Sequence, residues 1–149
     1  MTPEAMAQAC ADAMWAEDNA SQGLGMRIEA VCPGSARLAM EVAQRMVNGL
    51  GVCHGGFIFT LADSAMAFAS NSYNERALAQ MGTVTFLRPG RLGETLTAQA
   101  QERARAGRTG IYDVRISGSD GSVVAEFRGH TRGIGQKFFE VEVSDVNGP

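Results

Sequence analysis

The sequence contains few lysines, cysteines and histidines and no long hydrophobic run: Lys137 is the only lysine, and 149 residues include 3 cysteines and 2 histidines. An odd number of cysteines without close spacing predicts neither a disulfide framework nor a zinc centre, and it favours a reduced, cytoplasmic compartment. No segment approaches the roughly 18 consecutive apolar residues of a membrane-spanning helix. Residues 1–20 contain four acidic and no basic side chains, a pattern unlike that of a secretory signal.

The net charge is also small, at -3, which argues against a protein that binds nucleic acid without sequence preference. This charge is unevenly distributed. Residues 88–132 have 8 arginines and 5 acidic residues, whereas residues 1–87 have 4 arginines and 8 acidic residues. A positive block of this kind suits an anionic ligand, although the solvated face of a sheet is the more common cause of such a pattern.

Length and a hydrophobic share of 45% are typical of one domain with a substantial core. In the second half of the chain, apolar and polar residues alternate with a period of two, which predicts strands. Turn-forming segments such as the Pro-Gly pair at 89–90 separate the alternating runs, so residues 83–132 are expected to form a four-stranded antiparallel meander. Residues 26–42 contain two further runs around the Pro-Gly pair at 33–34, which predicts a hairpin.

Residues 55–72 do not alternate, are too long for a strand and are apolar on every side, which predicts one long buried helix. Residues 1–20 are expected to form an amphipathic helix packed on the body of the protein. Its apolar residues recur at roughly helical spacing: Met6, Cys10, Ala13 and Met14. This order of elements predicts an α+β fold in which an antiparallel sheet wraps around the long helix. The expected domain spans residues 21–134, and residues 135–149 form a tail without an assigned role.

Asp63 is the only charged residue within the predicted buried helix. Burying a carboxylate costs several kcal/mol unless it is paired, and no arginine or lysine lies within one helical turn of Asp63. Two interpretations follow. Either Asp63 faces a cleft, with a raised pKa, and acts as a base or nucleophile, or it is a structural residue whose carboxylate accepts hydrogen bonds from hydroxyls such as those of Thr60 or Ser64.

A glycine-rich segment, residues 48–56, immediately precedes the long helix. Gly55 and Gly56 would leave backbone N–H groups accessible at the positive end of the helix dipole, which suits an oxyanion or a polarised carbonyl group. An ordinary glycine-rich loop explains the same residues. His54 is a candidate acid, loop-ordering donor or cap, and Cys53 lacks the placed partners that a thiol nucleophile needs.

Gly55 and Asp63 are eight residues apart, so they lie roughly 12 Å apart along a helix. One small reacting group cannot contact both residues of the same chain. If both serve one site, two copies of the helix must run antiparallel and contribute one residue each. The spacing therefore predicts a two-fold dimer with two equivalent sites across its interface.

These features together resemble the hotdog-fold acyl-CoA thioesterases, and most closely their phenylacetate-degradation (PaaI-type) branch. The resemblance covers about residues 20–134. It rests on Asn48, the His-Gly-Gly sequence at 54–56, Asp63 in the buried helix, and the Phe-Leu-Arg-Pro-Gly sequence at 86–90. The hotdog fold and hydrolysis of an aryl- or hydroxyaryl-acetyl-CoA, or a related medium acyl-CoA, are what the resemblance implies.

By resemblance, Asp63 corresponds to the catalytic carboxylate, as nucleophile or general base, and the backbone N–H of Gly55 polarises the thioester carbonyl. His54 and Asn48 correspond to residues that support the loop and the carbonyl. The expected substrate-binding residues are Gly56, Thr83 (with Gln80 as its alternative), Arg88, Pro89, Gly90, Arg91 and Arg108, the arginines being candidates for the CoA phosphates. The resemblance further implies a homodimer with shared sites, assembled into a homotetramer. Neither metal nor cofactor is expected, because coenzyme A belongs to the substrate, and neither nucleic acid nor membrane is an expected partner.

Two alternatives remain at this point. A hotdog-fold enoyl-CoA hydratase or dehydratase would use His54 as its catalytic base. An acyl-CoA-binding protein without catalytic activity would retain the pocket, although such regulators usually carry a DNA-binding module.

Overall fold

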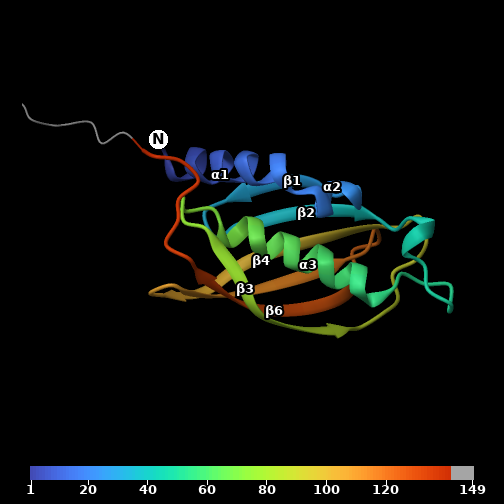
Figure 1. Cartoon of the computed structure of the whole chain (residues 1–149). Coiled ribbons are helices and arrows are strands. Elements are labelled where there is room, and N and C mark those ends of the chain that lie inside the picture. The colour runs from blue at the N-terminus through green and yellow to red at the C-terminus, as the bar shows by residue number, and fades with distance from the viewer. Residues whose placement is uncertain (142–149) are drawn as a thin grey trace, which may run out of the picture.

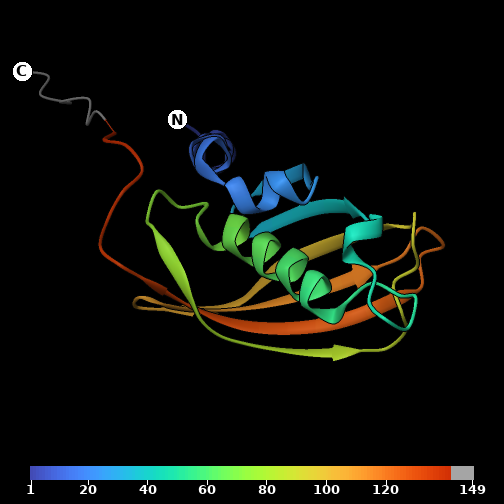
Figure 2. The same ribbon diagram turned by 45° about the vertical axis from the view of Figure 1, so that its right-hand side comes forward.

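The computed structural model describes residues 1–141. A six-stranded antiparallel sheet curves around the long helix α3 (Gly55–Ser70), as Figures 1 and 2 show from two directions. In chain order the strands are β1 (Arg27–Cys32), β2 (Ser35–Glu41), β3 (Ala77–Phe86), β4 (Thr95–Ala106), β5 (Thr109–Ser117) and β6 (Val123–Gly133). The predicted α+β architecture, a sheet wrapped around one helix, is confirmed.

Strand order is β1-β2-β4-β5-β6-β3. The predicted hairpin is present, since β1 and β2 pair with Cys32 opposite Ser35 and Gly34 has the positive φ of 72° that favours glycine. The predicted four-stranded meander is only partly right. Strands β4, β5 and β6 form a meander, but β3 starts at Ala77 and pairs with β6 instead of β4.

The connection between β3 and β4, residues 87–94, explains this difference. It crosses the end of the sheet. At its start the N–H of Leu87 donates to the carbonyl of Val124 in β6, and at its end the carbonyl of Glu94 accepts the N–H of Val42, beside β2. Midway, the carbonyl of Gly90 accepts the N–H of Cys53 at 2.9 Å. The connection therefore moves the chain across two strands, β6 and β5, and also supports the segment that leads into α3.

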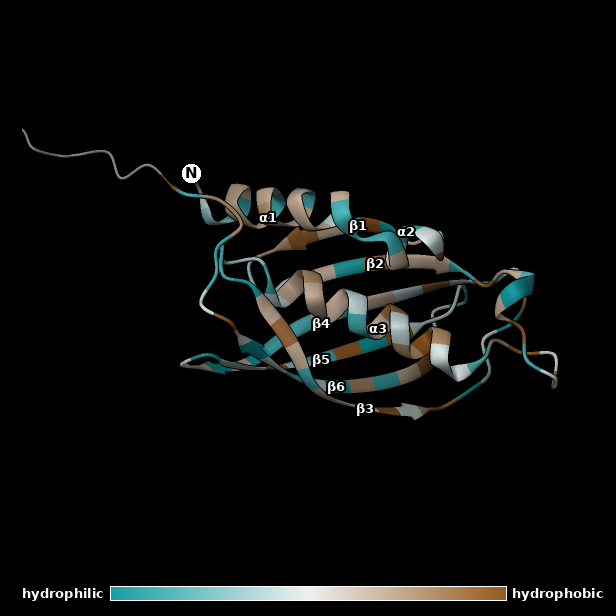
Figure 3. Cartoon of the chain, viewed as in Figure 1, coloured by the Kyte–Doolittle hydropathy of each residue, from teal (hydrophilic) through white to brown (hydrophobic). Residues whose placement is uncertain are grey.

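Helix α3 packs most of its surface into the concave side of the sheet, and the hydropathy colouring of Figure 3 shows its apolar character. Ile58, Leu61, Ala65 and Phe68 are among its buried residues. The burial of the helix is uneven, however. Gly56, Thr60, Asp63 and Ala67, at spacings of four, three and four, form one stripe that is exposed or half-buried. We call these four residues the open stripe.

Two helices precede the sheet: α1 (Pro3–Glu17) and the short α2 (Asn19–Gly23); a one-turn 3-10 helix, Gln44–Met46, follows β2. Helix α1 contacts β1 and α3. It buries Ala7, Cys10 and Ala11, whereas Ala13, expected on the packed side, is exposed. Within residues 1–141, no helix has the length and apolarity to cross a membrane.

Candidate functional site

Helix α3 begins at a side-chain cap. The backbone of His54 is extended, and its Nδ1 atom accepts the N–H of Gly56 at 2.9 Å, so His54 is the N-cap residue. This hydrogen bond occupies Nδ1 and one of the free N–H groups at the helix start. Within the described residues no group accepts the N–H of Gly55, which remains available at the positive end of the helix dipole.

Asn48 organises the turn before this cap. Its side-chain oxygen accepts the N–H of Leu50 at 2.9 Å and that of Val52 at 3.3 Å, and its own N–H donates to the carbonyl of Val52. The N–H of His54 donates to Met46 at 2.7 Å. Asn48 and His54 therefore both fix the backbone around Gly55.

A hollow of 410 Å³ opens beside this helix start. We call it the helix-start hollow. Its lining is largely apolar: Val52, Cys53, Gly55, Ile58, Phe86, Leu87, Arg88 and Pro89. The ring of Phe86 lies directly over Gly55, since a Cβ atom placed there would meet its Cζ at 2.8 Å. Cys53 is 4% exposed and burial raises the pKa of its thiol, so it is unsuited to act as a thiolate nucleophile.

Asp63 faces a second cavity, of 340 Å³, on the side of β3. We call it the acid cavity. Residues from α1, α3, the turn after α3, β3, β6 and the C-terminal segment line it: Met14, Asp63, Met66, Ala67, Ser70, Asn71, Arg76, Ala77, Leu78, Ala79, Thr131, Ile134, Gln136 and Phe138. Among residues 1–141, Asp63 and Arg76 are the only charged residues of this lining. Such a mostly apolar cavity with one carboxylate is typical of a small-molecule site.

The carboxylate of Asp63 has no hydrogen-bond or ion-pair partner among residues 1–141. The two hydroxyls considered as partners are engaged elsewhere: Thr60 donates to the carbonyl of Gly56 at 2.8 Å, and Ser64 shares a hydrogen bond with Ser21 at 2.8 Å. Burial raises the pKa of the Asp63 carboxyl, because desolvation disfavours its charged form. Neither Thr60 nor Ser64 therefore supplies the hydrogen bond that the structural interpretation of Asp63 calls for.

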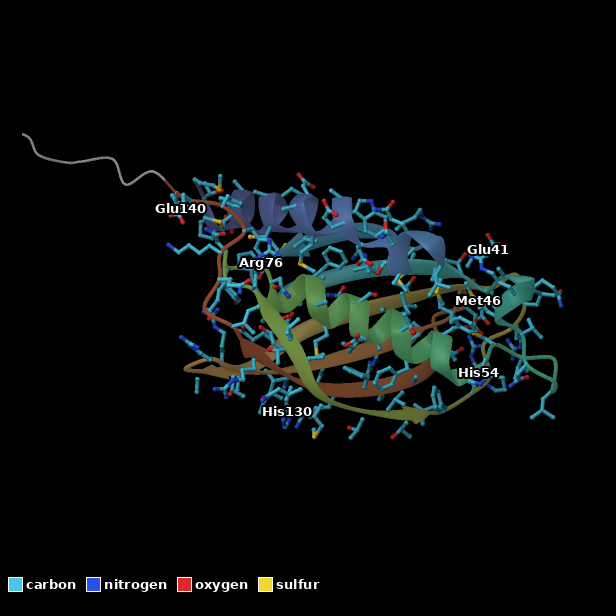
Figure 4. The ribbon with its side chains drawn as sticks, viewed as in Figure 1. Glu41, Met46, His54, Arg76, His130 and Glu140 are labelled. Atoms are coloured by element: carbon cyan, nitrogen blue, oxygen red, sulfur yellow. The ribbon has the colours of Figure 1, made fainter. Side chains whose placement is uncertain are left out.

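The two features belong to different regions of α3. In Figure 4 the labelled His54 lies at the N-terminal end of the helix. The labelled Arg76, which shares the acid cavity with Asp63, lies near the other end. The eight-residue spacing of Gly55 and Asp63 corresponds to roughly 12 Å along the axis. Within one chain, the free N–H and the unpaired carboxylate cannot contact the same small group.

The three arginines expected to bind phosphates lie in different surroundings. The guanidinium of Arg88 bonds to Glu94 at 2.5 and 3.1 Å and to Ser122 at 2.7 Å, and it lies 3.3 Å from Asp120. Its hydrogen bonds hold the pKa of the Glu94 carboxyl below its usual range. Arg88 is thus a structural residue in this chain, contrary to expectation. Arg91 is exposed beside Pro89 and Gly90, whereas Arg108 lies in the β4–β5 turn.

Two candidates for substrate binding lie on β3: the hydroxyl of Thr83 and the amide of Gln80. Neither residue lines the acid cavity of its own chain. Thr83 pairs with Arg128 and lies in a shallow hollow on the outer face with Asp113 and Glu126. Gln80 is the extra residue of a β-bulge and is exposed. Sequence reasoning missed the cavity residues Arg76 and Phe138, because their tertiary placement has no local signal; the aromatic pair at 138–139 was the one visible hint.

His130 lies opposite Met81 in the β3–β6 ladder and is half-buried. Figure 4 shows it low on the sheet, on β6, well separated from His54. Among residues 1–141, no three histidine, cysteine, aspartate or glutamate side chains gather in a way that could hold a metal ion.

Comparison with known proteins agrees with this geometry. A family model described as the thioesterase superfamily matches residues 50–125. Acyl-coenzyme A thioesterase PaaI of Escherichia coli (strain K12) is 44% identical over 125 residues, which are 84% of this chain and 89% of the relative. The structure of the E. coli PaaI protein from the phenylacetic acid degradation operon superposes with a TM-score of 0.90 at 41% identity, over 91% of this chain and 99% of that one.

A structure of smu.793 from Streptococcus mutans UA159 bound to acetyl CoA superposes with a TM-score of 0.73 at 25% identity, over 75% of this chain and 90% of that one. These findings confirm the hotdog fold and the resemblance to the PaaI branch that the sequence predicted.

Proposed function

The chain belongs to the thioesterase superfamily and is an acyl-CoA thioesterase, and we propose that it hydrolyses an aryl- or hydroxyaryl-acetyl-CoA, or a related medium acyl-CoA, to the free acid and CoA. The proposal rests on one observation above all: the unpaired, half-buried carboxylate of Asp63 in a mostly apolar cavity. CoA is part of the substrate, and neither a metal nor a further cofactor has a role in the proposed reaction.

Asp63 has two routes to the same products. As a general base, its carboxylate takes a proton from water while the water oxygen attacks the thioester carbon. As a nucleophile, it attacks that carbon itself and releases CoA thiolate, which takes up a proton; water then cleaves the resulting anhydride. In both routes negative charge develops on the thioester oxygen. The free N–H of Gly55 at the helix dipole is the proposed donor to that oxygen.

The proposed site needs two chains. The spacing of Gly55 and Asp63 supports this, and so do two uncovered surfaces. The open stripe on α3 contains small side chains that permit close approach of a second helix, and β3 is an edge strand that pairs only with β6. Along β3, Leu78 is 62% exposed, Met81 44% and Phe86 49%. A second copy placed antiparallel on both surfaces would bring its Gly55 to the acid cavity.

Arg91 is the preferred candidate for CoA phosphates, because it is exposed in the connection beside the helix-start hollow. Arg108 remains a second candidate. In this arrangement the pantetheine arm occupies the helix-start hollow of one chain, and the acyl group enters the acid cavity of the other. Assembly of two dimers into a homotetramer remains part of the proposal.

A panel of CoA esters with a thiol-trapping readout tests the proposed function. Phenylacetyl-, hydroxyphenylacetyl-, benzoyl- and straight-chain esters are compared with the wild-type chain and with Asp63→Asn. We expect release of CoA with the highest kcat/KM for arylacetyl esters, and loss of turnover in the variant. Release of no CoA from any ester would overturn the activity, and a preference for long straight chains would overturn the substrate class.

The capping contact of His54 supports this reaction over that of a hydratase or dehydratase. Its Nδ1 atom is engaged in capping α3 and is not free to take a proton from a substrate while it does so. No observation favours the hydratase or the binding-only alternative, so hydrolysis remains the one function proposed.

A further inference from the structure

The C-terminal segment, residues 134–139, does not leave the domain after β6. In Figures 1 and 2 the red trace runs past the start of β3 and then toward α1. The N–H of Ile134 donates to the carbonyl of Arg76 at 2.9 Å, and the N–H of Arg76 donates to Gln136 at 2.7 Å. Two backbone hydrogen bonds to Arg76 therefore join the segment to the chain that follows α3.

Asn74 fastens the end of this segment. It is 7% exposed and has a φ of 56°, a left-handed conformation that asparagine tolerates better than most residues. Its Oδ1 atom accepts the N–H groups of Phe138 at 3.0 Å and Phe139 at 3.3 Å, and its Nδ2 donates to the carbonyl of Phe139 at 2.9 Å. The backbone position of both phenylalanines is thus set by one buried side chain.

The two phenylalanines differ in what they contact. Phe138 lines the acid cavity together with Asp63 and Met66, whereas Phe139 is not part of that lining. The guanidinium of Arg76 lies 4.4 Å from the centroid of the Phe138 ring, a cation–π distance. Arg76 also donates through Nε to the carbonyl of Lys137 at 3.3 Å. The ring of Phe138 is therefore held at the cavity wall by its backbone and by a stacked cation.

The acid cavity also receives Met14 from α1. Met14 and Phe138 come from the two ends of the chain, outside the alternating segments that form the sheet. Both are apolar and both line the cavity that Asp63 faces. The two terminal segments thus shape the cavity that, in the proposed function, accepts the acyl group.

We propose that Phe138 determines acyl specificity, forming an aromatic wall against which the ring of an arylacetyl group packs, with Asn74 and Arg76 as its positioning residues. This inference rests on the proposed function, since it assigns the acyl group to the acid cavity. Aromatic rings favour edge-to-face and offset contacts with one another, which a flexible alkyl chain does not reproduce. Phe138 accordingly favours aryl esters over straight-chain esters without contacting the thioester.

The test compares three variants by the ratio of kcat/KM for phenylacetyl-CoA to that for octanoyl-CoA. Phe138→Ala removes the ring, Phe138→Tyr retains it, and Phe139→Ala removes the neighbouring ring that does not line the cavity. We expect the ratio to fall about tenfold in Phe138→Ala, in line with a lost aromatic contact and its packing, and to stay within about twofold of wild type in the other two.

The outcomes separate the two proposals. An unchanged ratio in Phe138→Ala, an equal fall in Phe139→Ala, or an equal loss on every ester overturns the role of Phe138 and leaves the thioesterase function standing. A wild-type chain that releases CoA from no ester overturns the proposed function and this inference with it. Thermal melting of all variants accompanies the kinetics. If Phe138→Ala does not fold, Phe138→Leu, which removes the ring but keeps apolar bulk, takes its place with the same expected fall in the ratio.

Discussion

The Nδ1 atom of His54 lies 2.9 Å from the backbone nitrogen of Gly56 and accepts its N–H. Because of this contact, the N–H groups of the two glycines at the start of α3 differ. Gly56 is engaged by its cap, whereas the N–H of Gly55 remains without an acceptor among the described residues. The helix start therefore offers one donor to a ligand at the position where the helix dipole is most positive.

A capping role for His54 predicts that asparagine can replace it. His54→Asn supplies a side-chain oxygen to the N–H of Gly56, so we expect nearly wild-type kcat and melting temperature. His54→Ala leaves that N–H without an acceptor, and it is expected to lose about 1 kcal/mol of stability and part of kcat. Equal and severe loss of kcat in both variants would contradict capping and would favour His54 as a catalytic base.

The donor role of Gly55 predicts a difference between two substitutions at one position. Gly55→Pro removes the N–H at the first helical residue, where proline is tolerated, and the extended backbone of His54 is compatible with a following proline. Gly55→Ala retains the N–H and introduces the same Cβ contact with Phe86. We expect kcat of the proline variant to be about a hundredfold below that of the alanine variant. Similar kcat values in the two would contradict the role.

Because the pKa of Asp63 is raised, an increase in pH is predicted to raise activity and to lower stability. Because the carboxylate is the active form, kcat/KM should rise with pH, with a midpoint above the usual range for aspartate. The folded state binds this proton more tightly than the unfolded state, so stability falls as pH rises through that range. Asp63→Asn is therefore expected to lose kcat about a hundredfold or more, while melting at neutral pH at or above the wild-type temperature.

A variant that melts at a clearly lower temperature than wild type would contradict this account, because it would identify Asp63 as a structural residue. The measurements are a pH profile of kcat/KM for the wild type and thermal melts of both proteins at neutral pH.

Arg88 and Arg91, the two arginines of the β3–β4 connection, are predicted to have different roles, the first in stability and the second in binding CoA esters. Arg88 has a side chain that is 16% exposed and paired with Glu94, so Arg88→Ala should lower stability by about 2 kcal/mol or more. Arg91→Ala should leave the melting temperature unchanged and raise KM for CoA esters, by an amount that shrinks at high salt. Melting curves and KM at two salt concentrations check both; a KM effect confined to Arg88→Ala would contradict the assignment.

Local signals predicted the parts of the fold that depend on neighbouring residues. The turn at Gly34 and the start of α3 at Gly55 follow from glycines and periodicity that are visible in the sequence. Pairing of β3 with β6 was not predictable in the same way, since alternation identifies a strand but not its neighbour. The long connection, held by Cys53 and Gly90, decides that pairing through tertiary contacts.

The candidate site shows the same division. Asn48, His54, Gly55 and Asp63 lie within a short stretch of chain; helical spacing related Gly55 to Asp63, and the family resemblance supplied Asn48 and His54. Phe138 joins the acid cavity from 75 residues further along the chain than Asp63, through Asn74, and no sequence pattern indicates that contact. Thr83 was chosen by its position after the helix, but the pleat of β3 directs it to the outer face.

The central claim is that Asp63 of one chain and Gly55 of another form one site, and mixing two inactive variants tests it most directly. Asp63→Asn and Gly55→Pro chains are co-expressed with different tags, and the mixed dimers are assayed for CoA release. Each mixed dimer retains one site with both native residues, so a random mixture should recover about a quarter of wild-type activity. Mixed dimers that form and remain inactive would contradict a site shared between chains.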